Sequence, residues 1–152
     1  MPILIIILLW SCNSGNRPTY INLDKNRILI ENQLKGENVD EIDLCKSFNF
    51  EWDSIIVIRP YTPKERIKRL NISNLWVSID SIENHTFNDT KSTLLFIYNG
   101  HINYWGSIPD LRFRFHMIAT KSPIDFPIIQ RLDCVKKIKK AVPGGDMYYT
   151  LK

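Results

Sequence analysis

The order of apolar and polar positions divides the chain into segments with different predicted structures. Residues 54–59 read Ser-Ile-Ile-Val-Ile-Arg, with four consecutive apolar, β-branched positions. Such a run is typical of a strand that is covered on both faces of a sheet. Pro60 ends the run because proline lacks the N–H that the next ladder bond needs. We therefore predict a central strand at 54–59.

The residues after this strand predict the start of a helix. Thr62 is the expected N-cap, Pro63 suits the first turn, and Glu65 completes a capping box. Apolar residues three positions apart follow, with basic residues around them. The pattern predicts a short, capped, amphipathic helix at about 63–70 that packs on the sheet.

Alternating apolar and polar positions predict further strands. The pattern covers residues 75–82, which we expect to form a half-buried strand. It recurs in residues 111–116, where Leu111, Phe113 and Phe115 are expected to point inward.

A hairpin is predicted between residues 92–98 and 101–106, because Asn99-Gly100 is the preferred pair for a type I′ turn. The polar residues before it, 83–91, are interpreted as a loop. Residues 107–110 follow the hairpin and end its second strand near Pro109.

The segment at 24–34 has a rough apolar face, with Asp24 as the expected cap and Gly36 after its end. We favour a helix there, and a strand at 27–31 is the alternative. Residues 39–44 combine apolar and acidic positions and predict a short, charged edge strand.

The C-terminal part allows two interpretations. Residues 126–133 can form a helical turn or two that begins at Pro127, and the helical period continues to about residue 139. We favour a last hairpin between 134–141 and 147–151. These segments together predict an α+β fold with a mainly antiparallel sheet.

The N-terminus has the pattern of a targeting segment. Residues 2–10 are uninterruptedly apolar. The run is too short for a membrane-spanning helix, which needs about 20 residues, but suits a signal peptide. Leu9-Trp10-Ser11-Cys12 resembles a bacterial lipobox. The resemblance implies that Cys12 carries lipid and anchors the protein to a membrane, and the alternative is a buried strand with an ordinary core cysteine.

With a lipidated Cys12, residues 1–11 are a lipoprotein signal peptide, 12–18 a tether and 19–152 a single α+β domain. The tether lacks the acidic run that marks surface export in lipoproteins of Bacteroidota. We therefore expect a lipid-anchored protein of the cell envelope, on the periplasmic face.

The other two cysteines, Cys45 and Cys134, would then be exposed to an oxidising compartment. They either form a disulfide or stay separate as buried thiols.

A net charge of +4 indicates only a weak preference for anionic partners, and we predict no nucleic-acid partner. The basic run at 136–140 either leans on anionic headgroups or forms a solvated face.

Residues suited to catalysis or metal binding are scattered. His85, His101 and His116 share no ligand spacing, so we predict no metal site. There is no nucleophile elbow and no phosphate-binding glycine loop, so we predict no cofactor. Asp53 follows Trp52, and such a carboxylate can act as an acid, although an aspartate at a strand entrance more often binds backbone amides.

Phe50-x-Trp52-Asp53, followed by a strand and Pro60-Tyr61-Thr62, resembles a pattern of uncharacterised small bacterial lipoproteins and secreted domains. The resemblance covers about residues 44–106 and implies export without implying an activity. If Tyr61 lies exposed beside Trp52 and Asp53, this corner is the expected interaction site.

Three functions fit these observations. The favoured one is a non-catalytic binding module with a protein partner in the envelope. The alternatives are an immunity or inhibitor protein, and an envelope hydrolase whose site is built from loops such as 83–91 and 107–110.

Overall fold

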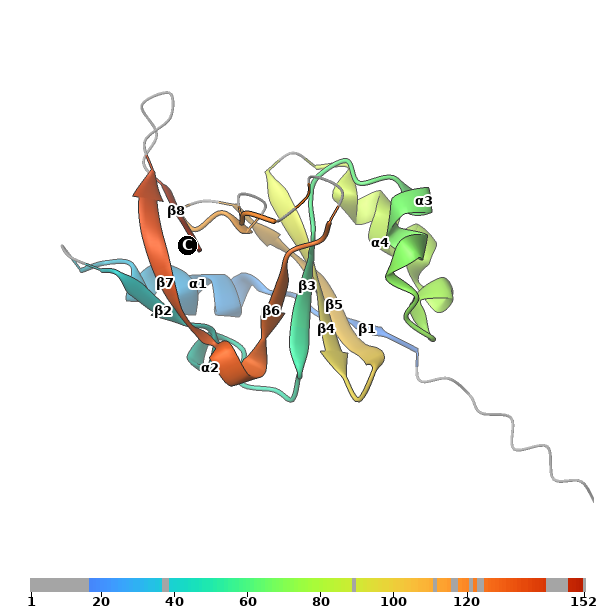
Figure 1. The fold of residues 1–152 in the computed structure, drawn as a ribbon, viewed down its shortest axis with the longest axis horizontal. Coiled ribbons are helices and arrows are strands. Elements are labelled where there is room, and N and C mark those ends of the chain that lie inside the picture. Colours follow the sequence, from blue (N-terminus) through green and yellow to red (C-terminus); the bar gives the residue numbers. More distant parts are fainter. Residues whose placement is uncertain are drawn as a thin grey trace, which may run out of the picture.

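A computed structural model of the chain shows an α+β fold, as predicted from the sequence (Figure 1). It describes residues 17–36, 39–88, 90–110, 112–115, 118–120, 122, 125–141 and 148–151. The helices are α1 (Asp24–Gln33), α2 (Leu44–Ser47), α3 (Lys64–Ile67) and α4 (Ile79–Thr86), with 3-10 turns η1 (Lys68–Leu70), η2 (Leu75–Val77) and η4 (Arg131–Asp133). The strands are β1 (Thr19–Tyr20), β2 (Glu41–Asp43), β3 (Ser54–Ile58), β4 (Lys91–Tyr98), β5 (His101–Pro109), β6 (Ile128–Gln130), β7 (Val135–Ala141) and β8 (Tyr148–Leu151).

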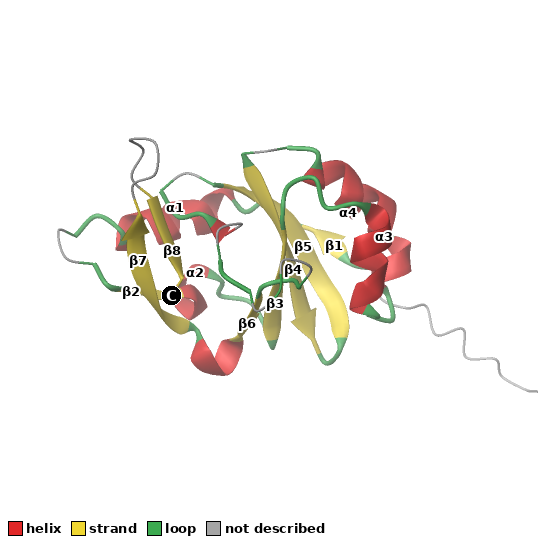
Figure 2. Cartoon of the chain, turned by 45° about the horizontal axis from the view of Figure 1, so that its top comes forward, coloured by secondary structure: helices red, strands yellow, loops and turns green. Residues whose placement is uncertain are grey.

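The described strands form two sheets. The larger has the order β1-β5-β4-β3-β6 and is antiparallel except for the β1–β5 pair. The smaller has the order β2-β7-β8 and is antiparallel throughout. Helices α3 and α4 lie on one face of the large sheet, whereas α1, α2 and the small sheet lie on the other (Figure 2).

Strand β3 is buried on both faces, which explains its consecutive apolar residues. Ile55 and Val57 belong to the core under α1 and the small sheet. Ile56 and Ile58 belong to the second core, under α3 and α4. Because β4 and β6 pair with the two edges of β3, the predicted central strand is confirmed.

The predicted hairpin is also confirmed. Asn99 and Gly100 both have positive φ angles, of 49° and 76°, as a type I′ turn requires. The turn residues and the antiparallel pairing of β4 with β5 therefore both specify this hairpin.

The strand predicted at 75–82 is wrong, because the segment forms η2 and the first half of α4. Leu75, Ile79 and Ile82 are its buried residues, spaced four and three apart as on a helix face. The segment 83–91 is correspondingly no continuous loop, since α4 extends to Thr86 and β4 begins at Lys91.

The helix predicted at 63–70 is present as α3 and η1, but the predicted capping box is wrong. The Thr62 hydroxyl donates backward to the Arg59 carbonyl at 2.7 Å. The first backbone N–H of α3, on Lys64, donates to the Glu83 carboxylate of α4 at 2.7 Å. A residue from the neighbouring helix therefore replaces the local cap.

Helix α1 confirms the favoured reading of residues 24–34, and the alternative strand there is wrong. The N-cap is Leu23 and not Asp24, whose backbone N–H donates to the Asn22 side chain at 2.7 Å. The charged edge strand is confirmed as β2, at the edge of the small sheet.

At the C-terminal end, β7 and β8 confirm the predicted hairpin. The helical turns that could have begun at Pro127 are not formed, because β6 pairs with β3 before a single 3-10 turn. In place of the strand predicted at 111–116, the described residues show an isolated bridge from Phe113 to Tyr149. Phe113 and Phe115 are buried as expected, while Leu111 and His116 lie outside the described residues.

Gly106 in β5 lies where the incoming chain passes closest to the sheet. A Cβ at this position would lie 2.3 Å from the Ile21 carbonyl oxygen, and the Ile21 N–H donates to the Trp105 carbonyl at 2.8 Å. We expect Gly106→Ala to lower the free energy of unfolding by about 1–3 kcal/mol, because the backbone must shift. Urea denaturation measures this loss.

Gly36→Ala is the matched control, because its Cβ would meet only a side-chain atom, Cγ2 of Val39 at 2.9 Å, and no backbone atom. An equal or larger loss in this control would contradict the close approach at Gly106.

Candidate functional site

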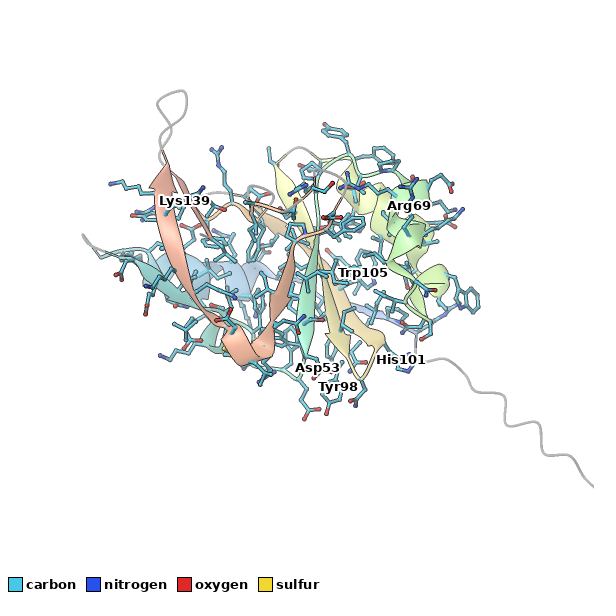
Figure 3. All side chains as sticks on the ribbon, in the orientation of Figure 1. Asp53, Arg69, Tyr98, His101, Trp105 and Lys139 are labelled. Carbon is cyan, nitrogen blue, oxygen red and sulfur yellow. A yellow bond between two sulfur atoms is a disulfide. The ribbon has the colours of Figure 1, made fainter. Side chains whose placement is uncertain are left out.

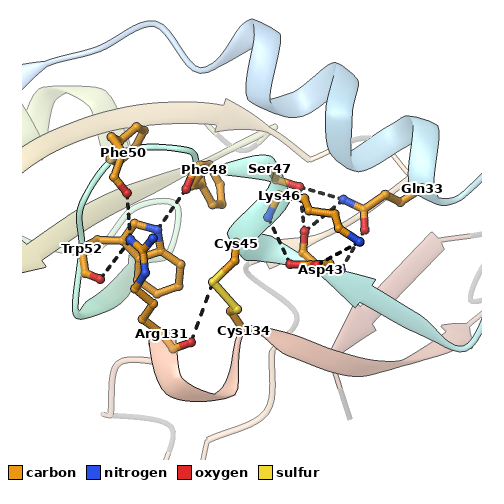
Figure 4. The surroundings of a disulfide bond; sticks show 10 residues. All are labelled: Gln33, Asp43, Cys45, Lys46, Ser47, Phe48, Phe50, Trp52, Arg131 and Cys134. Atoms are coloured by element: carbon orange, nitrogen blue, oxygen red, sulfur yellow. Dashed lines mark hydrogen bonds and ion pairs between the residues drawn. A yellow bond between two sulfur atoms is a disulfide. The ribbon is translucent and has the colours of Figure 1, made fainter.

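A disulfide joins Cys45 in α2 to Cys134 after η4 (Figure 4). Strand pairing brings the two cysteines together, because Asp43 of β2 lies opposite Val135 of β7. The Leu44 N–H then donates to the Cys134 carbonyl at 2.9 Å. The Cα atoms of the two cysteines are 5.6 Å apart, which is the usual separation for a disulfide. Of the two readings left open by the sequence, the structure contains the disulfide.

Arg131, in the 3-10 turn η4 that precedes Cys134, contacts the residues around Trp52. Its guanidinium donates to the Phe50 carbonyl at 2.8 Å and lies over the Trp52 ring, 5.3 Å from the centroid. The Trp52 indole N–H donates to the Phe48 carbonyl at 3.3 Å. Trp52 is fully buried, so it is a structural residue.

Asp53 binds backbone groups of its neighbours. Its carboxylate accepts from the Asn99 N–H in the β4–β5 turn at 2.7 Å. Its own N–H donates to Ile97, and its carbonyl accepts from the Arg131 N–H, at 2.6 and 2.8 Å. The carboxylate thus positions a hairpin turn, in agreement with the structural interpretation.

The predicted interaction corner is not formed as one surface. Tyr61 is 60% exposed, but β3 separates it from Asp53, and five strand residues span roughly 17 Å. The pattern from Phe50 to Thr62 therefore starts and ends at opposite ends of one strand. Sequence proximity was misleading here because an extended strand carries its two flanks far apart.

Tyr61 instead lies near the end of α4, with two other exposed aromatic residues. Its backbone N–H donates to the Thr86 carbonyl at 2.7 Å, and Phe87 comes next in the chain. Tyr20 packs on His85 of the same helical turn, with ring centroids 5.0 Å apart. The exposed fractions of Tyr20, Tyr61 and Phe87 are 49%, 60% and 62%. We call these three residues the aromatic surface.

Sequence reasoning missed the aromatic surface. Its members come from segments that are far apart in the chain, and the sequence predicts a loop around Phe87. The only available signal was an apolar ring in a polar segment, which does not distinguish exposure from burial.

His85 and Ser107 form the contact that most resembles a catalytic pair. The His85 Nδ1 lies 3.1 Å from the Ser107 hydroxyl, which also lies 3.3 Å from that of Thr93. Trp105 packs edge-on against the His85 ring at 5.1 Å. A histidine can activate a serine in this way when a third group orients the imidazole. Among the described residues, no carboxylate bonds to the His85 ring, so this orienting group is lacking.

The loops proposed for a hydrolase, 83–91 and 107–110, lie largely in regular elements of the structure. Residues 83–86 belong to α4, and 107–109 belong to β5. Packing of α4 on the sheet therefore accounts for the His85–Ser107 contact.

The three histidines of the sequence have different environments. His101 is exposed and its Nδ1 lies 2.7 Å from the Ser73 hydroxyl. His85 is half-buried, and His116 lies outside the described residues.

One group of residues in the described chain has ligand atoms within 4.8 Å of one another: Asp43, Cys45 and Cys134. The two sulfur atoms are bonded to each other and carry no thiolate, so the group is a disulfide beside a carboxylate and does not form a metal site.

A half-open hollow of about 490 Å³ lies beside β6. Apolar residues from three segments form most of its lining, among them Leu70, Ile118, Phe126 and Ile128. The Arg59 guanidinium donates to the Ile118 carbonyl at 3.0 Å, and burial, followed by the charge of Arg66, lowers its pKa. Asp125 is the single carboxylate in the lining, so the hollow lacks a paired acid and base.

The expected lipidation site, Cys12, lies outside the described residues, as do residues 1–16. Of the expected tether at 12–18, Arg17 is exposed and Pro18 is already buried against the domain. In the described part of the chain, no helix has the length and apolar character needed to cross a bilayer.

Comparison of the chain with protein-family models, with curated proteins and with solved structures found no match. The resemblance to small lipoproteins therefore stays a prediction from the sequence.

The environment of His85 predicts a pH dependence of stability. Burial, followed by the charge of Lys91, lowers the pKa of His85 below its usual value of 6.5. The unfolded chain then takes up a proton at a higher pH than the folded chain does. Proton uptake by His85 therefore favours the unfolded chain, and the free energy of unfolding should fall as the pH falls from 6.5 through the lower, folded pKa. Urea denaturation in this range should show a flatter decline for His85→Gln than for the wild type.

His101→Gln is the matched control, because His101 is exposed. A decline with pH that is the same in the wild type and in His85→Gln would exclude His85 as its source.

Proposed function

We propose that the protein is an exported, lipid-anchored component of the cell envelope, and that its folded part is a non-catalytic module that binds a protein. The observation that carries the proposal is the Cys45–Cys134 disulfide. Disulfides persist in oxidising compartments and are rare in the cytosol. This agrees with an export signal at residues 1–11 and with Cys12 as the lipidated residue.

Lipid attachment makes anchoring stable without a membrane-spanning helix. Each buried methylene contributes about 0.8 kcal/mol, and two or more acyl chains hold a protein on a bilayer. The proposed location is the periplasmic face of a membrane, since the residues after Cys12 lack an acidic run.

The binding role is supported by the aromatic surface. Tyr20, Tyr61 and Phe87 expose about half or more of their area to solvent. Aromatic residues are enriched where proteins bind one another, because they bury a large area at a small entropic cost. The described residues offer no comparable arrangement of catalytic groups, since the His85–Ser107 pair lacks an orienting carboxylate.

We expect radioactive palmitate to label the wild-type chain in growing bacteria and to leave Cys12→Ala unlabelled. The double variant Cys45→Ala, Cys134→Ala is the control and should take up label, because its lipidation signal is intact. Alkylation of the labelled protein without reduction should leave Cys45 and Cys134 unmodified. Label on Cys12→Ala, or two free thiols in the mature protein, would contradict the proposal.

The binding role predicts a position-dependent crosslink. A photoreactive amino acid at Phe87 should yield a discrete crosslinked species in native membranes, and Tyr61→Ala should weaken it. The same probe at Leu132 is the control, because Leu132 is fully exposed on η4, away from the aromatic surface. Identical products at the two positions would show that the aromatic surface has no specific partner.

A further inference from the structure

Trp76 is the most exposed tryptophan of the described chain. Its side chain is 76% exposed, whereas Trp52 and Trp105 are 0% and 4% exposed. It lies on η2, at the border of a hollow of about 180 Å³ that is also lined by Lys68, Asn71, Ile72, Leu75 and Ile79. An indole with apolar residues below it and a lysine beside it has the composition of a membrane-interface contact.

Two basic residues precede this indole in the chain, and one of them, Lys68, lines the same hollow. Lys68 and Arg69 are exposed on η1, and with Trp76 we call them the tryptophan face. Lys68 pairs with Glu65 at 3.2 Å, and Asp80 of α4 pairs with Lys64.

Counting the segment as a whole, residues 64–69 carry more basic than acidic side chains. Asp80 offsets one of these positive charges through its pair with Lys64, and Glu83, whose carboxylate accepts from the Lys64 backbone N–H, offsets a second. The segment keeps an excess of positive charge, as an anionic surface requires.

The tryptophan face lies at the end of the molecule where the chain enters. Thr19 of β1 pairs with Tyr104 of β5, so residue 17 lies near the level of Ile102. The Asn74 side chain bonds both the N–H and the carbonyl of Ile102, at 2.9 and 2.8 Å. Asn74 is two residues before Trp76, so the entering chain and η2 lie at the same end of β5.

The entering chain also limits the distance to the proposed anchor. Cys12 is five residues before Arg17, and five fully extended residues span at most roughly 18 Å. A lipid on Cys12 would therefore hold this end of the domain close to the headgroups. The β7 lysines lie at the opposite end, where Lys139 is labelled in Figure 3.

We propose that the tryptophan face rests on an anionic membrane surface, with the Trp76 indole at the level of the headgroups. The inference rests on the proposed lipid anchor at Cys12. It assigns the two basic regions different roles: Lys68 and Arg69 contact lipid, and the β7 lysines form a solvated face that points away from the membrane.

The test uses the lipidated full chain in vesicles of phosphatidylethanolamine and phosphatidylglycerol, with part of the lipid brominated on its acyl chains. Bromine quenches tryptophan fluorescence at short range. We expect quenching in the wild type and its loss in Trp76→Phe, because the other described tryptophans are buried. Replacing Lys68 and Arg69 by Gln should weaken the contact by roughly fivefold for each charge near the surface.

The matched control moves the indole to the far end of the domain. Lys139→Trp in the Trp76→Phe background should stay unquenched on the same vesicles, because the exposed Lys139 lies at the opposite end of the molecule (Figure 3). If the lipidated chain floats with the vesicles but Trp76 is unquenched, or if both positions are quenched equally, the inference fails and the anchor stands. A chain that carries no lipid and does not float overturns the anchor and the inference together.

Discussion

The Cys45–Cys134 disulfide closes a crossing at which two segments of the chain pass between the two sheets. The segment from β2 to β3 and the segment from β6 to β7 run side by side in opposite directions, from one sheet to the other. Pairing stops between Leu44 and Asp53 on the first segment. The disulfide spans this interruption and links positions 89 residues apart. In the chain-entropy model, closing a loop of that length contributes about 4.6 kcal/mol.

The interruption arises from a difference in length. Between the paired positions the first segment has residues 45–52, whereas the second has only 132–133. The extra residues fold inward and place Phe48 and Trp52 in the core. Their carbonyls then lack a strand partner, and buried backbone acceptors need one. The Arg131 guanidinium supplies donors to the Phe50 and Trp52 carbonyls, at 2.8 and 3.4 Å, and so replaces the missing ladder.

The sequence predicted those elements whose signals are local. The Asn99-Gly100 turn and the run at 54–58 needed no knowledge of distant residues, and both are present. The Arg131 contacts could not be predicted, because they depend on the unequal lengths of two segments far apart in the chain. The aromatic surface was hidden for the same reason.

The helical layer shows how a local pattern can mislead. Leu75, Val77 and Ile79 alternate as in a strand, while Leu75, Ile79 and Ile82 follow a helical face. Burial decides between the two patterns, because Leu75, Ile79 and Ile82 together pack into the core between the sheet and the helices α3 and α4.

Helix α4 separates the two surfaces to which we assign roles. Trp76 precedes its first residue and Phe87 follows its last, and eight helical residues span about 12 Å. Both aromatic side chains are exposed, so the packing of α3 and α4 on the sheet requires neither Trp76 nor Phe87. The buried residues of α4 face the sheet and set its position. A membrane contact at one end of α4 and a protein contact at the other would therefore be fixed relative to each other by the same packed helix. Neither contact would involve the disulfide crossing, which lies on the opposite face of the sheet.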